Sequence, residues 1–442
     1  MKNKIYLIGI GGIWVSAIAR YYLSEGWEVS GSDKTNSWLI EALQDEWCDI
    51  IIGSEAEKIT PDIDLVVYTE AIPKSQSELM RVWELWLTAM PYNKALWNIA
   101  NQKKLIAITG THGKSTTTSL SSILLKDSDT NFTAIVGTIL KEFGGKNFYH
   151  QKNTDAEEYF TIEACEYKRH FLEYKPYIGI ITNIELDHLD YYTWEDDYLD
   201  AFKSFVENIL PGGYLILNWD DTNCQKLIWL RDDITYIPVT QGGYTLDGVV
   251  NSFTEINMQI PGDHVLFDAK LVYTAGKILD IPEDSIVKAL ESYSWVWRRM
   301  EIIWATENQN IIMSDYGHHP TEIEVTTKAL QQWHPDKKLF VIFQPHQYSR
   351  TLELLDGFKN CFSHCDTVII PNIYESRDSE EDKAKINTDS LVEMIRHDDI
   401  HNGKGFENTL KMIQDYDKKN PASSIILLLW AGNVDDLRFE LF

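Results

Sequence analysis

The chain has 442 residues, of which 44% are hydrophobic and 24% are charged, and this balance excludes a disordered, collagen-like or coiled-coil chain. Asp and Glu number 67 against 40 Lys and Arg, a net charge of -27, so nucleic acids and anionic membranes are poor candidate partners. At about 100 to 200 residues per domain, the length predicts two to four domains.

The apolar stretches are short. The longest, such as residues 425–430, fall far below the roughly 20 residues that a membrane span needs. Residues 1–12 run into a glycine-rich loop without the apolar segment of a signal peptide, and five widely spread cysteines do not suggest a disulfide framework. We therefore expect a cytoplasmic protein that does not insert into membranes.

Apolar runs that end in polar or glycine-rich turns predict the strands of three consecutive α/β domains. The expected strands lie at residues 5–8, 28–32, 65–68, 105–108, 159–162, 177–181, 339–343, 367–370 and 424–429, with a further one near Ile311. Apolar residues at helical spacing between them predict parallel sheets. We expect a Rossmann-like domain over residues 1–97, a central P-loop ATPase domain over 98–306 and a C-terminal Rossmann-like domain over 307–442.

The first turn nearly matches the dinucleotide-binding pattern GxGxxG. Gly9 and Gly11 follow the first strand, and Asp33, 22 residues after Gly11, stands near the position of the ribose-binding acid of such folds. Trp14 occupies the third glycine position. Alone, this pattern suggests NAD and an oxidoreductase, an alternative that the second phosphate loop opposes.

That second loop, from Gly110 to Thr116, is the strongest chemical signal in the chain. Small residues let backbone N–H groups surround a phosphate, Lys114 can neutralise its oxygens, and the Ser115 hydroxyl suits Mg²⁺. Ile108 stands where the usual P-loop has its first glycine. A glycine-containing turn without a ligand is the structural alternative, but Lys and Ser at the start of a helix favour nucleotide binding.

Acidic, amide and histidine side chains follow the next two predicted strands. They are Glu163 and Glu166 after the first strand, and Asn183, Asp187 and His188 after the second. Ligands bind at the carboxyl edge of parallel sheets, where both groups should lie. The combination, rather than any one residue, predicts a metal site for phosphoryl chemistry.

In chain order, these motifs resemble those of the Mur ligase family. They are Gly9-Ile10-Gly11-Gly12, Ser30-Gly31-Ser32-Asp33, Thr109 to Ser115, Glu163-Ala164-Cys165-Glu166-Tyr167, Thr182-Asn183 with Asp187-His188, Arg298-Arg299, and Asp315-Tyr316-Gly317-His318-His319-Pro320. The resemblance covers nearly the whole chain.

The resemblance implies an ATP-dependent ligase of peptidoglycan precursor synthesis. It would join L-alanine to the lactyl carboxylate of UDP-N-acetylmuramate through an acyl phosphate, with ATP and Mg²⁺ as cofactors, and would be a monomer or homodimer. A sister ligase that attaches a recycled tripeptide to the same UDP-sugar is one alternative. A catalytically inactive nucleotide-binding relative is another.

The resemblance also implies roles for individual residues. The UDP-sugar would contact Gly9, Ile10, Gly11, Gly12, Ser32 and Asp33. ATP would contact Gly110, Thr111, His112, Gly113, Lys114, Ser115, Thr116, Arg298, Arg299 and Asp315. Ser115, Glu163 and His188 would hold the metal, and Lys114, His188 and Arg350 would be catalytic.

The tryptophan content is unusual. The chain has 15 Trp and only 24 Gly, or 5.4%, where about 7% is typical. Eight Trp stand where the resemblance expects Gly: Trp14, Trp47, Trp86, Trp97, Trp219, Trp295, Trp304 and Trp430. One hypothesis is a stop codon that the source reads as Gly and that is translated here as Trp; the alternative is a divergent protein that repacked around Trp. We expect an indole at Trp14 to clash where helix and strand pack closely.

Overall fold

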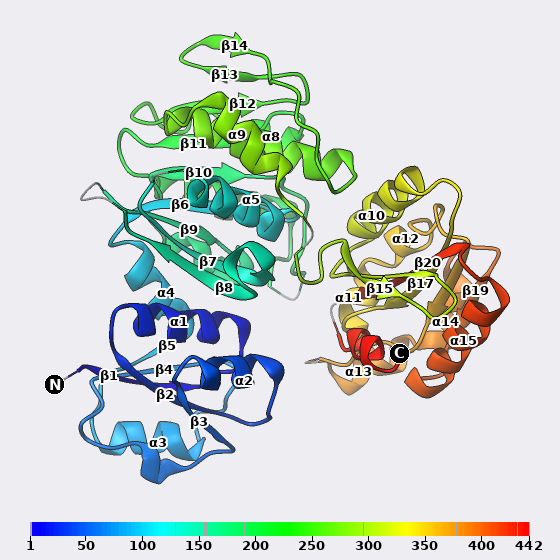
Figure 1. Ribbon diagram of the computed structural model, residues 1–442, viewed down its shortest axis with the longest axis horizontal. Coiled ribbons are helices and arrows are strands. Elements are labelled where there is room, and N and C mark those ends of the chain that lie inside the picture. Colours follow the sequence, from blue (N-terminus) through cyan, green and yellow to red (C-terminus); the bar gives the residue numbers. More distant parts are fainter. Residues whose placement is uncertain are drawn as a thin grey trace. The chain divides into compact units, whose positions relative to one another are not determined.

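The computed structural model describes residues 2–128, 130–153, 157–189, 191–294, 296–376, 378–430 and 432–441. Within these residues the strands form sheets of five, nine and six strands in chain order (Figure 1). The chain divides into two compact units. The first holds Met1–Glu185, Leu199–Phe253 and Leu271–Ala289, and the second holds Leu186–Tyr198, Thr254–Lys270 and Leu290–Phe442.

The N-terminal sheet has the strand order β3-β2-β1-β4-β5, and its strands are parallel. Its strands are β1 (Lys4–Ile8), β2 (Glu28–Asp33), β3 (Asp49–Ile52), β4 (Leu65–Tyr68) and β5 (Ala89–Pro91). Its helices are α1 (Ile13–Ser24), α2 (Trp38–Asp45), η1 (Ala56–Lys58), α3 (Ser77–Glu84) and α4 (Tyr92–Ala100). The three predicted strands and the Rossmann-like arrangement are confirmed.

The central sheet has the order β14-β13-β12-β11-β10-β6-β9-β7-β8, with a parallel middle and antiparallel edges. Its strands are β6 (Lys104–Thr109), β7 (Phe132–Leu140), β8 (Lys146–Gln151), β9 (Tyr159–Glu163), β10 (Ile178–Ile181), β11 (Tyr214–Asn218), β12 (Thr235–Val239), β13 (Tyr244–Leu246) and β14 (Val249–Asn251). Because β6 lies between β9 and β10, the carboxyl ends of these three strands meet at one edge.

Helices connect these central strands and lead to the next sheet. They are α5 (Lys114–Lys126), η2 (Lys141–Phe143), η3 (Tyr167–Glu173), α6 (Glu195–Glu207), α7 (Thr222–Gln225), α8 (Asp263–Ile278) and α9 (Glu283–Glu291). Helix α5 packs against β6, β7 and β9. Its start is therefore fixed directly beyond the end of β6.

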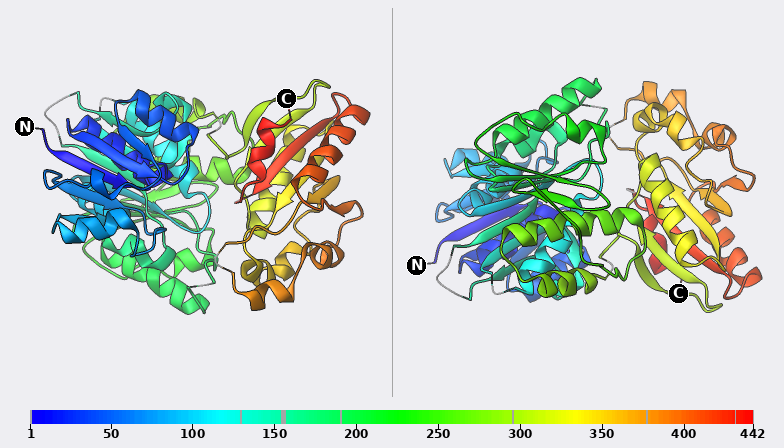
Figure 2. Two further views of the ribbon diagram at one scale, coloured as in Figure 1. Left: turned by 90° about the horizontal axis from the view of Figure 1, so that it is seen from below. Right: turned by 90° about the horizontal axis from the view of Figure 1, so that it is seen from above.

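The C-terminal sheet has the order β15-β16-β20-β17-β18-β19, parallel except for β15, and helices lie on both of its faces (Figure 2). Its strands are β15 (Glu301–Ala305), β16 (Ile311–Asp315), β17 (Lys338–Gln344), β18 (Thr367–Ile370), β19 (Ile400–Asn402) and β20 (Ser424–Trp430). Its helices are α10 (Pro320–Trp333), α11 (Tyr348–Glu353), α12 (Leu355–Phe358), α13 (Glu380–Lys385), α14 (Thr388–Met394), α15 (Phe406–Lys419) and η4 (Val434–Phe439).

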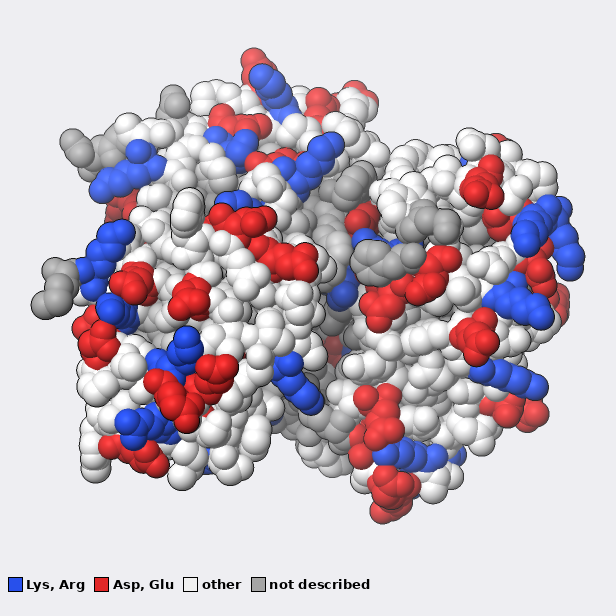
Figure 3. All heavy atoms as spheres, turned by 60° about the horizontal axis from the view of Figure 1, so that its bottom comes forward, with Lys and Arg blue, Asp and Glu red and all other residues white. Residues whose placement is uncertain are grey.

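On the face drawn in Figure 3, acidic and basic residues are interspersed. Across the described part of the chain, no helix combines the length and the apolar character that crossing a bilayer demands.

Within the first unit, α1 joins the N-terminal sheet to the central one by packing against β7 and β8. Arg20 of α1 is buried; its guanidinium donates to Glu46 at 3.0 and 3.1 Å and to Asn147 Oδ1 of β8 at 2.5 Å. The Asn147 amide donates in turn to the Ile13 carbonyl and to Ser16 Oγ. A buried polar network of this kind fixes one orientation, because each member depends on the others.

We expect Arg20→Ala to lower the free energy of unfolding by about 2 kcal/mol, because Asn147 Oδ1 loses its donor and the half-buried Glu46 carboxylate keeps only the more exposed Lys146. Urea unfolding measures the change. The matched control is Arg81→Ala, which removes an exposed pair with Glu84 and should cost at most about 0.5 kcal/mol. Equal losses in both variants would show that the network does not stabilise the junction.

Candidate functional site

The loop between β6 and α5 depends on two glycines. Gly110 has a φ angle of +132°, and a Cβ there would collide with the Thr182 hydroxyl and lie 2.9 Å from the Asn183 carbonyl oxygen. Gly113 has a φ of +81° and is the N-cap of α5. A residue with a side chain would strain the backbone at both positions. The close approach at Gly110 joins the loop to the segment that follows β10.

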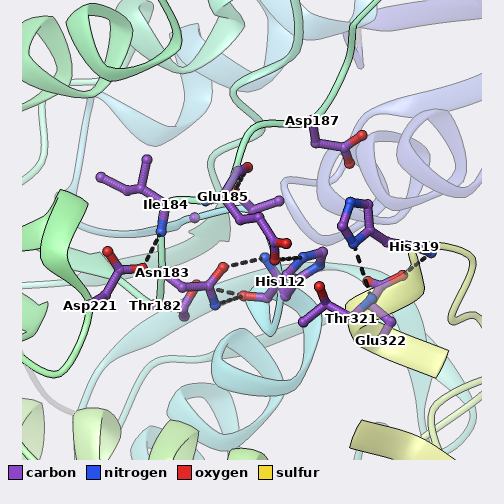
Figure 4. A network of polar contacts seen from close by, with 12 residues as sticks. His112, Thr182, Asn183, Ile184, Glu185, Asp187, Asp221, His319, Thr321 and Glu322 are labelled. Atoms are coloured by element: carbon purple, nitrogen blue, oxygen red, sulfur yellow. Dashed lines mark hydrogen bonds and ion pairs between the residues drawn. The ribbon is translucent and has the colours of Figure 1, made fainter. Parts of the chain in front are cut away.

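Hydrogen bonds hold the loop against that segment (Figure 4). The Thr111 N–H donates to the Asn183 carbonyl at 3.0 Å, and the His112 N–H donates to Asn183 Oδ1 at 2.9 Å. In return, the Asn183 amide and the Thr182 hydroxyl both donate to the His112 carbonyl, at 3.0 and 2.5 Å. The backbone of the loop is thus set before any ligand arrives.

Asp221 supports this arrangement and was not anticipated from the sequence. One carboxylate oxygen accepts from the Ile184 N–H at 2.9 Å. The other accepts from the N–H groups of Asn223 and Cys224, so Asp221 caps the start of α7. An Asp directly before a short helix is a capping signal. Its second contact depends on strand order, which a local pattern does not contain.

The Lys114 ammonium lies over the loop. It donates to the carbonyls of Gly110 and Thr111 at 2.6 and 3.0 Å and to Glu166 Oε1 at 3.0 Å. Glu166 is fully buried, and a buried carboxylate needs such a cation because desolvation is costly. The pair therefore holds the Lys114 amine at the mouth of the loop.

Ser115 and Glu163 lie together at the adjacent strand end. The Ser115 hydroxyl donates to Glu163 Oε2 at 2.9 Å, and the Gly137 N–H of β7 donates to Glu163 Oε1 at 2.7 Å. A hydroxyl and a carboxylate are oxygen donors that Mg²⁺ prefers, so the pair fits that ion. The third predicted ligand, His188, belongs to the second unit, so metal binding by all three residues stays a prediction. An ATP contact from the half-buried Thr116 also stays a prediction.

The N-terminal glycine-rich loop is tied to the end of β2. The N–H groups of Gly9 and Ile10 donate to the Ser32 carbonyl at 2.8 and 3.1 Å, and the Gly11 N–H donates to Asp33 Oδ2 at 2.9 Å. Gly12 is the N-cap of α1. Asp33 therefore binds the loop backbone itself in this structure.

The Ser32 side chain faces inward. Its hydroxyl donates to Glu78 Oε2 at 2.9 Å, and the Tyr6 hydroxyl donates to Glu78 Oε1 at 2.7 Å, all within the buried N-terminal core. A UDP-sugar contact from Ser32 stays a prediction. It would have to come from the backbone or follow the loss of this hydrogen bond.

Trp14 lies in the first turn of α1, and the predicted clash with the neighbouring strand is wrong. Helix α1 still packs on β1, because the indole extends towards the central sheet. Its Cζ2 atom lies 2.8 Å from the point that a Cβ on Gly137 would occupy. The indole therefore lies against Gly137, whose N–H holds Glu163.

In the second unit, Asp315 lies at the end of β16 beside the paired arginines. Its carboxylate accepts from the Met300 and Gly317 N–H groups, both at 2.8 Å. Burial raises the pKa of Asp315, and the nearby Arg299 cation opposes the shift. ATP binding by Asp315 and the paired arginines stays a prediction.

Arg298 is held between two aromatic rings. Its guanidinium carbon lies 3.8 Å from the Trp297 ring centre and 4.0 Å from that of Trp430, and Nε lies 3.6 Å from Asp435 Oδ2. Burial lowers the pKa of Arg298. Both contacts are cation–π interactions, which stabilise a buried guanidinium.

Arg350, at the start of α11, pairs with Asp187. Its Nη2 lies 2.8 and 2.9 Å from the two carboxylate oxygens. Although burial opposes it, the Arg350 cation holds the pKa of Asp187 well below its usual range. Nearby, the Glu322 carboxylate accepts from the N–H groups of His318 and His319 at the start of α10 (Figure 4).

Known proteins share this organisation. Three family models match the chain in order: the Mur ligase family, catalytic domain, at residues 4–104, the Mur ligase middle domain at 108–266, and the Mur ligase, glutamate ligase domain at 298–431. A UDP-N-acetylmuramate--L-alanine ligase of Clostridium novyi (strain NT) is 36% identical over 98% of this chain and 96% of its own length. A UDP-N-acetylmuramate--L-alanine ligase of Alkaliphilus metalliredigens (strain QYMF) is 35% identical over 98% of this chain and 95% of its own length.

Solved structures agree on the fold. The UDP-N-acetylmuramate-alanine ligase of Thermotoga maritima superposes with a TM-score of 0.78 at 23% identity and covers 99% of this chain and 98% of its own. A murein peptide ligase of Psychrobacter arcticus 273-4 superposes with a TM-score of 0.73 at 20% identity, and the match covers 99% of this chain and 98% of that chain. With full-length relatives above one-third identity and family models matching each part of the sequence, the chain belongs to the Mur ligase family.

Proposed function

We propose that this protein is the ATP-dependent ligase that joins L-alanine to the lactyl carboxylate of UDP-N-acetylmuramate. The observation that carries the proposal is the full-length similarity to curated relatives of that name. The preformed phosphate loop, with Lys114 at its mouth, supports it. The reaction would serve peptidoglycan synthesis and thus cell wall biogenesis, cell shape and cell division.

The chemistry requires activation, because a carboxylate does not acylate an amine. A carboxylate oxygen attacks the γ-phosphorus of ATP, ADP leaves, and an acyl phosphate forms. The alanine amine then attacks the acyl carbon, loses a proton, and phosphate leaves as the amide forms. Carboxylate and ATP repel each other, so positioning and cations must supply most of the rate enhancement.

The phosphate loop supplies both. The N–H groups of residues 110–115 stand at the start of α5, where the helix dipole favours an anion. On nucleotide binding, the Lys114 ammonium would exchange its hydrogen bonds with the loop carbonyls for a phosphate and keep Glu166 as its partner. Mg²⁺ held by Ser115, Glu163 and His188 would neutralise charge on the phosphoryl oxygens.

The remaining assignments follow the chain. We propose that the UDP-sugar contacts Gly9, Ile10, Gly11, Gly12, Ser32 and Asp33. ATP contacts Gly110, Thr111, His112, Gly113, Lys114, Ser115, Thr116, Arg298, Arg299 and Asp315. Arg350 contacts the alanine carboxylate or the acyl phosphate. Domains over residues 1–97, 98–306 and 307–442, a monomer or homodimer, and a cytoplasmic location complete the proposal.

Phosphate release should depend on L-alanine. With ATP, Mg²⁺ and UDP-N-acetylmuramate present, we expect rapid release on adding L-alanine and little release with a tripeptide in its place. A coupled phosphate assay measures both. Dependence on the tripeptide would instead support the recycling ligase, and no release with either amine would support an inactive relative.

Lys114→Ala should reduce ligation by at least about 10³-fold, because a cation aimed at the transferring phosphoryl group acts mainly in the transition state. Lys203→Ala is the control, since this partly exposed Lys pairs with Asp200 and carries no assigned role. Turnover and the circular dichroism spectrum are measured together. A folded Lys114→Ala protein with near-normal turnover would contradict the ATPase assignment.

Glu163→Gln and His188→Ala should each lower turnover far more than UDP-N-acetylmuramate affinity, since both are assigned to the metal rather than to the nucleotide-sugar. Calorimetry without ATP measures the affinity, and the phosphate assay measures turnover. Glu173→Gln is the control, because Glu173, in η3, is neither a proposed metal ligand nor a proposed substrate contact. A parallel fall of affinity and rate would show that the metal roles are wrong.

A further inference from the structure

Two tryptophans have backbone angles that favour glycine. Trp47 has a φ of 74° and Trp86 a φ of 56°. Among residues with side chains, mainly Asn, Asp and His adopt this left-handed region, and a bulky residue there is an outlier. The indoles are 91% and 93% exposed, so packing does not offset the backbone strain.

Both tryptophans end a helix in the same way. After α2, the Trp47 N–H donates to the Gln44 carbonyl at 3.0 Å, and the Cys48 N–H donates to the Leu43 carbonyl at 3.0 Å. After α3, the Trp86 N–H donates to the Trp83 carbonyl, and the Leu87 N–H donates to the Val82 carbonyl, at 3.2 Å each. This is the Schellman arrangement, in which the left-handed residue is usually Gly.

Helix α1 provides the comparison within the chain. It ends in the same two hydrogen bonds, from Gly26 to the Leu23 carbonyl and from Trp27 to the Tyr22 carbonyl. Here the left-handed residue is Gly26, with a φ of 79° and nothing within 4 Å of the Cβ position. Helix α8 ends in the same way at Asp280, with a φ of 54°, and Asp is one of the residues that tolerate this region. These four helix ends thus carry Gly once, Asp once and Trp twice.

Trp229 is a third tryptophan with a left-handed backbone, and the sequence did not indicate it. It has a φ of 62° and is 78% exposed. Fourteen described residues other than Gly have positive φ, and three of them are Trp, although Trp is only 15 of 442 residues. An indole has no local hydrogen bond that would favour this region, unlike the side chains of Asn or Asp.

We infer that the natural polypeptide carries glycine at positions 47, 86 and 229, encoded by a reassigned stop codon that is written here as Trp. The backbone at these three positions, the Gly26 comparison, and the joint excess of Trp and deficit of Gly all have this one cause. Of the other suspected positions, Trp14, Trp97, Trp219, Trp304 and Trp430 have no left-handed φ, and Trp295 lies outside the described residues.

Trp14 extends the inference to the candidate UDP-sugar loop, a step that rests on the proposed function. It stands at the third glycine of the N-terminal loop, and its indole lies against Gly137 beside the Glu163 carboxylate. Glycine at this position would leave that space open. Its backbone is helical, unlike that of the other three, so residue 14 joins the same codon class through its position in GxGxxG alone.

Sequencing the gene and the protein from its source tests the inference directly. We expect the same stop-type codon at each of positions 14, 47, 86 and 229, and we expect peptides whose masses fit Gly at these positions. Trp38 and Trp83 lie within regular helices and serve as controls that should have the ordinary Trp codon and mass. Ordinary Trp codons at 47, 86 and 229 would overturn the inference.

Stability provides a test that is independent of the gene. Trp47→Gly and Trp86→Gly should each raise the equilibrium constant for folding by about tenfold, from the cost of a left-handed residue with a Cβ. Trp83→Gly, within α3, should lower it several-fold, and Gly26→Trp should lower it as well. Losses at positions 47 and 86 that match the loss at 83 would contradict a glycine requirement.

Affinity for UDP-N-acetylmuramate separates the inference from the proposed function. We expect Trp14→Gly to bind more tightly than the chain as written, by calorimetry, with Trp38→Gly unchanged. A stop-type codon at position 14 without a gain in affinity would leave the codon inference intact and count against the UDP-sugar assignment of the loop. An ordinary Trp codon at 14 would remove that residue from the inferred class.

Discussion

The candidate site depends on one close approach, that of the Gly110 backbone to the segment after β10. No side chain fits between Gly110 and Thr182, and this contact lets Asn183 bond to both N–H groups that follow in the loop. Strand order explains the contact, because β6 lies between β9 and β10. The same edge brings Glu163 to Ser115 and Glu166 to Lys114.

Local patterns predicted the parts of this site but not how they are connected. The strands were predictable because they are continuous apolar runs buried in parallel sheets, as in β20, where every residue is buried. The phosphate loop was predictable because its glycines stand between an apolar strand and a helix that begins with Lys and Ser, and Gly110 and Gly113 both have positive φ in the structure. Asp221 was not, since its contact with Ile184 comes from the neighbouring position of β10 and β11.

Side-chain direction explains the other differences. Ser32 lies where the sequence placed it, at the end of β2, but its hydroxyl faces the buried Glu78 carboxylate from α3. Trp14 lies on α1 as expected, yet its indole extends towards β7 instead of β1. A pattern identifies the position of a residue on an element, whereas its direction depends on which neighbour the fold brings next to it.

The contact of Trp14 links the two glycine-rich loops of the first unit. The N-terminal loop ends at α1, whose first turn carries Trp14, and the indole lies against Gly137. The Gly137 N–H holds the Glu163 carboxylate, which in turn accepts from Ser115 of the phosphate loop. The size of residue 14 therefore determines how much space lies between the proposed UDP-sugar loop and the proposed metal ligands. Glycine at position 14 would open that space, although the helical backbone of α1 does not itself require glycine there.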